Sequence, residues 1–469
     1  MDDRRDELDG WLHERIDPLP PPPGTFELIK RRARRRKFRQ AAVSAGAVAA
    51  VAAAIIVVPR VTTALNVTPS EQGASSANGA AAAGSRASAP HSVLASASAQ
   101  PPNSSAHNVP APVTGPPPVP ASFAPTSVTF IGSDTGWVIG QAGTSGQCAT
   151  QYCTSVARTD SAGKTWSGGP APRAGAPSGA SGVSQIRFLN GTNGWAYGPA
   201  LFATHDGGQH WAQVPTGGYR VTDLETVGDR AFAVFASCSG SGAAFAAGCT
   251  SFSLYSSVAG SDNWAPVPGP VTGLTAGGGT TSASLVLTGS RGYLLAPGGA
   301  LYAGPVDGSG AWQQVSPGPG GVGTCGTGPA QPDGQPSAAF LAAATSSGLV
   351  LACAPAPGSA GAKVFTSSDG GTSWQQSGTA PGSSVVTSVA AQPGGETVLS
   401  TTAGLDVSHD GGASWQQLEQ DPSGPAGGFS YVGLTSQQQG VAVPANPGEH
   451  AIWFTYDGGL SWAPSPIKG

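Results

Sequence analysis

The residues of this sequence that could perform acid–base catalysis are few. Two carboxylates, Asp223 and Glu225, lie two positions apart in a β-rich run. A glycoside hydrolase needs two carboxyl groups that flank the scissile bond. Alternate residues of one strand point to the same side, so these two cannot flank a bond by themselves. The pattern therefore does not predict a paired-carboxylate enzyme.

Metal chemistry is also poorly supported. The six cysteines include no Cys-x2-Cys pair and the seven histidines are scattered, whereas a zinc site needs closely spaced ligands. Calcium is the better alternative, because recurring Asp-Gly-Gly turns resemble pieces of calcium loops. Each turn has one carboxylate, however, where a calcium site needs several oxygen ligands. We expect neither a metal nor another cofactor.

An eight-residue sequence motif, called the phrase below, recurs through residues 123–469. Near-complete copies of Ser/Thr-x-Asp-Gly-Gly-x-Ser/Thr-Trp occupy residues 204–211, 367–374, 408–415 and 455–462. Three degenerate (worn) copies, which match the motif only in part, have Ser161, Ala259 or Asp307 at the Asp position. The aspartates that we assign to turns are Asp206, Asp307, Asp369, Asp410 and Asp457. The tryptophans that end the copies lie 41 to 62 residues apart and are Trp166, Trp211, Trp264, Trp312, Trp374, Trp415 and Trp462.

The phrase has the properties of a tight turn between two strands. Its Asp can bond nearby backbone N–H groups, and the two glycines can adopt positive φ. The Trp begins the next strand and offers a large apolar surface to a neighbouring sheet. Short β-rich runs precede it, as at Val183–Leu189, Gly194–Gly198 and Ala200–Thr204. Four strands per unit, repeated with this period, predict an all-β propeller with seven four-stranded blades.

The phrase resembles the Asp-box (BNR) repeat of sialidase-like propellers in the YVTN/BNR-like superfamily. The stretches Thr135–Gly140 and Asn193–Gly198 are similar to the propellers of photosystem II assembly and stability factors. The resemblance covers roughly residues 123 to 469. It implies the propeller fold, and it implies that the box aspartates are structural, because Asp boxes lie away from the active sites of the enzymes that have them.

The resemblance also implies what a sialidase would need. Those enzymes bind the substrate carboxylate with three arginines, the first in an Arg-Ile-Pro context on the first strand, and use a tyrosine nucleophile paired with a glutamate. Arg-Ile-Pro does not occur here, and the expected first strand, Ser127–Ile131, has no arginine. Arg158 abuts an Asp box and Arg230 a turn on the same face. We therefore predict a non-enzymatic protein, with a divergent sialidase-like glycan hydrolase as the alternative.

The amino-terminal residues differ sharply in composition from the propeller. Residues 1–40 hold 11 of the 22 basic residues and are predicted to form a cytosolic tail. Residues 41–59 contain an uncharged run long enough to span a bilayer, and the preceding basic cluster predicts that the amino terminus stays inside. Residues 60–122 are rich in Ala, Ser and Pro and are predicted to form a disordered stalk.

Two alternatives remain for these segments. Leu8, Trp11, Leu12 and Ile16 would share one face of a helix, which predicts either a docking helix or a partly ordered tail. Small residues at Thr62–Ala64 would suit cleavage of a signal peptide, but the long stretch before the apolar run favours an uncleaved signal anchor. We therefore expect a single-pass protein of a bacterial cell envelope with its propeller outside the membrane.

All six cysteines lie in the propeller, near the ends of predicted strands and in loops on the face opposite the Asp boxes. An even number outside the cytoplasm predicts disulfides rather than free buried thiols. The pairs that we expect are Cys148–Cys153, Cys238–Cys249 and Cys325–Cys353.

The same face carries the long, irregular connections of the propeller, and we expect it to bind the partner. Aromatic residues and arginine most often anchor such contacts. Our candidates are Tyr152, Tyr219, Arg220, Phe245, Glu449 and His450. The alternative is that the disulfides only stabilise a Gly-rich domain. Residues 121–469 hold nine basic and 17 acidic residues, which argues against nucleic acid. We expect a monomeric propeller that binds or scaffolds an envelope protein or glycan, or helps to assemble a membrane complex.

Overall fold

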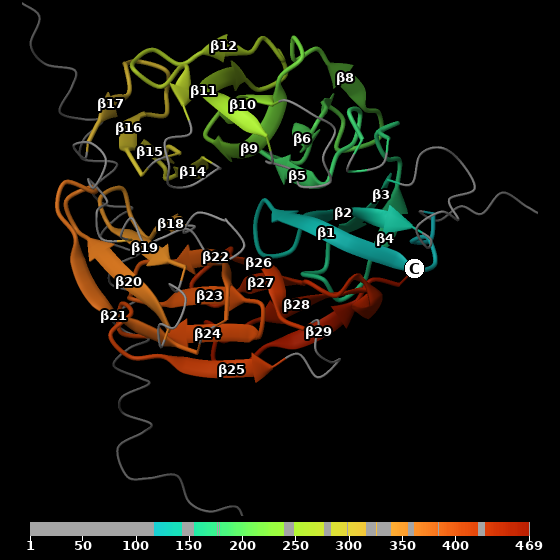
Figure 1. Cartoon of the computed structure of the whole chain (residues 1–469). Coiled ribbons are helices and arrows are strands. Elements are labelled where there is room, and N and C mark those ends of the chain that lie inside the picture. The colour runs from blue at the N-terminus through green and yellow to red at the C-terminus, as the bar shows by residue number, and fades with distance from the viewer. Residues whose placement is uncertain are drawn as a thin grey trace, which may run out of the picture. The chain divides into compact units, whose positions relative to one another are not determined.

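The structure, a computed structural model, is all-β in the part that it describes (Figure 1). The described residues are 117–142, 154–175, 177, 179–238, 248–275, 283–297, 299–315, 325, 339–354, 361–382, 384–420 and 427–468. One short 3₁₀ helix, η1 (Pro447–Glu449), is the sole helix among them. No helix in these ranges is long and apolar enough to cross a membrane. The expected tail, membrane segment and most of the stalk (residues 1–116) lie outside the described residues.

Seven antiparallel sheets of consecutive strands form the blades, which confirms the predicted propeller. The innermost strands are β1 (Phe123–Phe130), β5 (Gln185–Phe188), β9 (Arg220–Val227), β14 (Ser284–Leu287), β18 (Ala339–Ala343), β22 (Val386–Ala391) and β26 (Phe429–Leu434). The second strands are β2 (Gly136–Ala142), β6 (Gly194–Tyr197), β10 (Arg230–Cys238), β15 (Arg291–Leu295), β19 (Leu349–Cys353), β23 (Thr397–Thr401) and β27 (Gly440–Pro444).

The third strands are β3 (Thr154–Thr159), β7 (Leu201–Thr204), β11 (Cys249–Val258), β16 (Leu301–Pro305), β20 (Gly361–Ser367), β24 (Gly404–Ser408) and β28 (Ala451–Thr455). The outer strands are β4 (Ser167–Gly169), β8 (Ala212–Val214), β12 (Ala265–Pro266), β17 (Gln313–Gln314), β21 (Gln375–Pro381), β25 (Gln416–Gln420) and β29 (Ala463–Pro466). Blades 1 to 7 follow this order along the chain.

Blade 3 departs from four regular strands at its outer edge. There β12 and a further strand, β13 (Leu274–Thr275), both pair with β11. Gly269, between them, has φ +116°, and a Cβ there would lie 2.1 Å from the carbonyl oxygen of Trp312 in blade 4. The close approach of the next blade therefore requires glycine at this point and accompanies the break in the outer strand.

The core lies between blades, because each sheet buries both faces against its neighbours. The middle strands accordingly read as continuous apolar runs, such as Val441–Val443, and are fully buried. Aromatic pairs bridge several boundaries, as where Trp137 of blade 1 stacks on Phe188 of blade 2 with ring centroids 3.8 Å apart. Burying each such large apolar side chain stabilises the fold by about 1.5–3 kcal/mol.

The ring closes by contacts between blades 7 and 1, because each sheet consists of consecutive strands and no strand is exchanged. The side chain of Gln439 donates to the carbonyl oxygen of Ser133 at 2.8 Å. The hydroxyl of Tyr456 donates to the carbonyl oxygen of Ala162 at 2.6 Å. Figure 1 shows the first blade beside the last.

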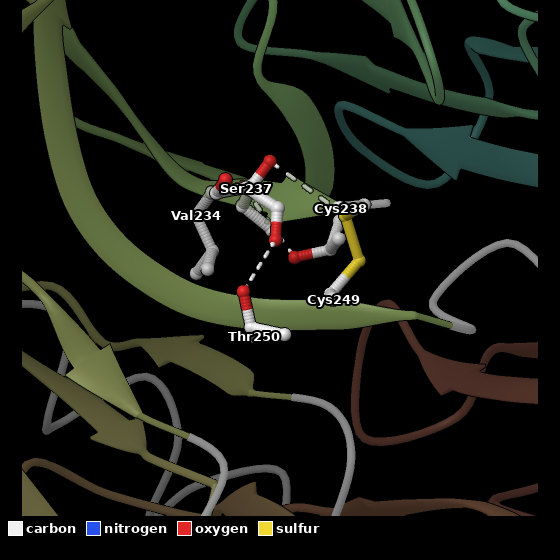
Figure 2. Close-up of a disulfide and its surroundings, with 7 residues drawn as sticks. Val234, Ser237, Cys238, Cys249 and Thr250 are labelled. Carbon is white, nitrogen blue, oxygen red and sulfur yellow. Dashed lines mark hydrogen bonds between the residues drawn. A yellow bond between two sulfur atoms is a disulfide. The ribbon is translucent and has the colours of Figure 1, made fainter. Parts of the chain in front are cut away.

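Two of the three expected disulfides are present. Cys238, at the end of β10, is bonded to Cys249, at the start of β11 (Figure 2). Cys325, between β17 and β18, is bonded to Cys353 at the end of β19. No free cysteine occurs among the described residues. The expected pair Cys148–Cys153 lies outside the described residues and stays a prediction.

Candidate functional site

Polar side chains of the innermost strands join neighbouring blades through backbone groups. Thr126 of β1 donates its hydroxyl proton to the carbonyl oxygen of Ser184, before β5, at 2.8 Å. The amide of Leu285 in β14 donates to Asp223 Oδ2 in β9 at 2.8 Å. Each inner strand has an edge without a further strand to pair with, so these side chains supply hydrogen bonds that a ladder supplies elsewhere. Polar residues near the centre are therefore partly structural.

One cluster of ionisable groups gathers at the centre from blades distant in sequence. Arg187 of β5 pairs with Glu225 of β9 through Nε and Oε1 at 3.0 Å. The Arg187 guanidinium also lies 5.5 Å from the ring centroid of Tyr431 in β26 and donates to the carbonyl oxygen of Ile186 at 2.9 Å. The side chains of Arg187 and Glu225 are 11% and 30% exposed. Blades 2, 3 and 7 thus converge on one buried guanidinium.

Asp223 lies next to this pair and is fully engaged by backbone groups. Its Oδ1 accepts from the amide of Leu224 at 2.9 Å and its Oδ2 from that of Leu285 at 2.8 Å. Burial, followed by repulsion from Glu225, raises the pKa of Asp223 to about 7. The amide donors and Arg187 act in the opposite direction. The carboxyl group therefore titrates near neutral pH while it holds blade 4 to blade 3.

The charged groups of the central cluster bind one another and nearby backbone groups. The cluster contains one arginine, and that arginine is neutralised by Glu225. Asp223 and Glu225 lie on one strand, as the sequence indicates. Sequence reasoning identified these two carboxylates but did not place Arg187 or Tyr431 with them, because no local pattern links strands of different blades. The described residues contain no group of His, Cys, Asp and Glu that could hold a metal ion.

The Asp-box turns form one face of the propeller. Asp369 illustrates them: its Oδ1 accepts from the amide of Ser373 at 2.9 Å and from the hydroxyl of Ser367 at 2.8 Å. Hydrogen bonds from the Ser373 hydroxyl and amide lower the pKa of Asp369 to about 2. The Gly370 amide donates to the carbonyl oxygen of Ser347, in the turn between the first two strands of the same blade, at 2.9 Å. Both kinds of turn therefore share a face.

The same face contains an open pocket between blades 4 and 5, with a volume of about 560 Å³. Arg291, the first residue of β15, lines it together with Ser346 and Ser347 of blade 5. The sequence analysis assigned no role to Arg291. The one sequence feature that could have indicated its position is Arg291-Gly292-Tyr293, which repeats the x-Gly-aromatic pattern of Thr135–Trp137 and Asn193–Trp195.

Four of the six expected partner-binding residues are described, on the face opposite the Asp boxes, and their environments differ. Tyr219, before β9, is 43% exposed, and the adjacent Arg220 is half-buried. Glu449 accepts a hydrogen bond from the indole of Trp453 at 2.9 Å. His450 Nδ1 lies 2.9 Å from the carbonyl oxygen of Phe123, so both side chains have structural contacts. The remaining candidates, Tyr152 and Phe245, lie outside the described residues.

Comparisons with known proteins return similar folds. No family model matches the sequence, and no curated protein matches it. A solved structure of YCF48 bound to D1 peptide is 19% identical, with a TM-score of 0.45, covering 72% of this chain and 95% of that one. YCF48 from Cyanidioschyzon merolae is 15% identical, with a TM-score of 0.42, covering 60% and 84%.

An ancestral GH74 enzyme is also similar to this chain. It is 14% identical, with a TM-score of 0.49, covering 74% of this chain and 47% of that chain. The similar structures thus include a protein bound to a peptide and an enzyme.

Proposed function

We propose that this protein is a binding module of the cell envelope, held by an amino-terminal membrane anchor with its propeller outside the cytoplasm. The observation that carries the proposal is the state of the central cluster. Arg187 is bound by Glu225 and Ile186, and both oxygens of Asp223 accept from backbone amides. Groups held in this way stabilise the ring, whereas a hydrolase needs carboxyl groups directed at a substrate.

The disulfides support the proposed location. Disulfides persist in oxidising compartments and are rare in the bacterial cytosol. Cys238, Cys249 and Cys353 lie at strand ends on the face opposite the Asp boxes, and Cys325 is bonded to Cys353 there. The basic cluster and the apolar run that precede the propeller in the sequence support an anchor with its amino terminus inside. We propose residues 1–40, 41–59, 60–122 and 123–469 as tail, anchor, stalk and propeller.

The proposed topology predicts a defined result from protease treatment. Protease added to intact spheroplasts is expected to cut the chain within residues 60–122 and release a fragment of about the propeller's size. The measurement is an immunoblot with antibodies to the propeller, and a cytosolic marker protein that stays intact is the control. Protection of the whole chain would show that the propeller is not outside the membrane.

The proposed partner surface is the face that carries Tyr219. A photoreactive phenylalanine analogue placed at position 219 of the full chain is expected to form covalent adducts with an envelope protein in cells. The matched control is position 456, because Tyr456 is also an exposed tyrosine (50%, against 43% for Tyr219) but lies in an Asp-box turn on the other face. Immunoblots of irradiated cells report the adducts. Adducts at position 456 and none at position 219 would show that the partner binds the Asp-box face, contrary to the proposal. Adducts at neither position would argue against a protein partner.

A further inference from the structure

The pocket between blades 4 and 5 lies on the Asp-box face, so an inference about it goes beyond the partner surface proposed above. Its volume of about 560 Å³ is within the range of about 300–1,000 Å³ that small-molecule pockets occupy. The residues with polar side chains that line it are Ser290, Arg291, Gln313, Ser346 and Ser347. Such a lining favours a polar ligand.

Among the described residues, no carboxylate forms an ion pair with the guanidinium in this pocket. Arg291 lies 5.7 Å from the ring centroid of Tyr293, two residues further along β15. Tyr293 is fully buried, and its hydroxyl donates to the carbonyl oxygen of Ser346 in blade 5 at 2.5 Å. The four ion pairs among the described residues do not include Arg291. The positive charge is therefore positioned by stacking and available to an anion.

The pocket lies in blade 4 beside its worn Asp box, since Pro305 and Ala311 on either side of that turn line it. In the six other blades, an amide of the box turn donates to the turn between the first two strands, as Gly411 does to Gly395 at 2.9 Å. Blade 4, whose two turns are both described, has no such bond. Its box turn is instead bound from blade 3, where Arg230 donates to the carbonyl oxygen of Asp307 at 3.1 Å. The pocket lies on the other side of blade 4, toward blade 5.

We propose that this pocket binds a carboxylate carried by a small polar ligand. One guanidinium matches one unit of negative charge and can donate two parallel hydrogen bonds to a carboxylate. A phosphate dianion would need further positive charge, and the surplus of 17 acidic over nine basic residues in residues 121–469 opposes its approach. The serine hydroxyls and the Gln313 amide would bond the polar atoms next to the carboxylate. The carboxylate can come from a peptide carboxy terminus or from a sugar acid.

The test uses the full-length protein in detergent and four probes in two matched pairs. N-acetyl-alanyl-alanine is compared with its carboxy-terminal amide, and glucuronate with glucose. Isothermal titration and ligand-detected NMR are expected to give dissociation constants on the order of 1 mM for at least one of the carboxylates. The neutral partner is expected to bind at least tenfold more weakly. The pair that shows the difference identifies the source of the carboxylate.

Arg291→Gln is expected to weaken carboxylate binding at least tenfold with an unchanged thermal unfolding midpoint, because Arg291 is exposed. Arg173→Gln is the control, since Arg173 is an exposed arginine that does not line this pocket. Equal binding of each carboxylate and its neutral partner, or no binding of any probe, overturns the proposal. Equal effects of Arg291→Gln and Arg173→Gln do so as well. None of these outcomes affects the partner surface around Tyr219, which the photocrosslinks test separately.

Discussion

Glu225→Ala is expected to lower the free energy of unfolding by about 3 kcal/mol, because it leaves the buried guanidinium of Arg187 without its carboxylate. The Arg187 side chain is 11% exposed, and its ion pair is the 3.0 Å contact with Glu225. Urea denaturation of the two proteins at pH 7 measures the difference. The loss is large because a charge that has been removed from water depends on its partner far more than a surface charge does.

Two further variants distinguish the loss of the ion pair from the loss of a side chain. Asp134→Ala removes an exposed carboxylate and is expected to change the free energy of unfolding by less than about 0.5 kcal/mol. Arg187→Met in the Glu225→Ala background removes the unpaired charge and is expected to recover much of the loss. A Glu225→Ala protein as stable as the Asp134→Ala protein would show that Arg187 does not depend on Glu225.

Asp406 is an exception within the repeat. The residue two positions before the Ser or Thr of the box packs toward the preceding blade, and it is Phe202 in blade 2, Phe365 in blade 5 and Trp453 in blade 7. In blade 6 this position holds Asp406, which is 2% exposed. Its Oδ1 has no hydrogen-bond partner among the described residues. A carboxyl group thus occupies a site that blades 2, 5 and 7 fill with an aromatic ring.

Asp406→Asn is expected to stabilise the protein at pH 8 by roughly 2–3 kcal/mol. Burial raises the pKa of Asp406 from 3.8 to about 6 in the folded protein. The folded state therefore retains a proton that the unfolded chain releases above a pH of about 4. The contribution of the protonated Asp406 carboxyl group to the free energy of unfolding is fully present below about pH 4 and is lost as the pH rises through about 6. The variant and the natural protein should therefore be equally stable at pH 4. Urea denaturation at pH 4 and pH 8 provides the measurement.

Asp410→Asn, in the same blade, is the control because its expected effect has the opposite sign. Hydrogen bonds from the Ser414 hydroxyl and amide lower the pKa of Asp410 to about 2. Its contribution to stability is present above the unfolded pKa of about 4 and is lost as the pH falls through about 2. Asp410→Asn should therefore destabilise the protein at pH 8. An Asp406→Asn protein that is less stable than the natural one at pH 8 would refute the proposed cost of burying the charged carboxyl group.

The blades could be predicted from the sequence because their determinants are local. Each Asp box fits within eight residues, and its hydrogen bonds, such as Gly371 N to Ser367 Oγ at 2.8 Å, join residues four apart. The pairing of Cys238 with Cys249 on adjacent strands likewise involves residues that are close in the sequence, 11 positions apart. Local chemistry repeated with a regular period thus determines the number of blades and their order.

The central cluster and the pocket could not be predicted, because each depends on how blades meet. Arg187 and Tyr431 are far apart in sequence and become neighbours only when the ring closes. The pocket at Arg291 is lined by residues of blades 4 and 5, whose approach to one another no local pattern indicates. The position of Asp406 relative to its box can be read from the sequence, but the burial of its carboxyl group depends on how the blades pack together.

The junction of blades 7 and 1 determines how the propeller responds to mechanical force. The chain enters the described propeller near Pro117, whose carbonyl oxygen accepts from the amide of Gly168 in β4 at 2.8 Å. Val119 and Ile467 pack in one apolar cluster at this junction. A pull on the amino-terminal side of the chain is therefore borne at this junction before it reaches any other blade boundary. In the described part of the chain no strand is shared across this junction, so hydrogen bonds from side chains and apolar packing oppose its opening.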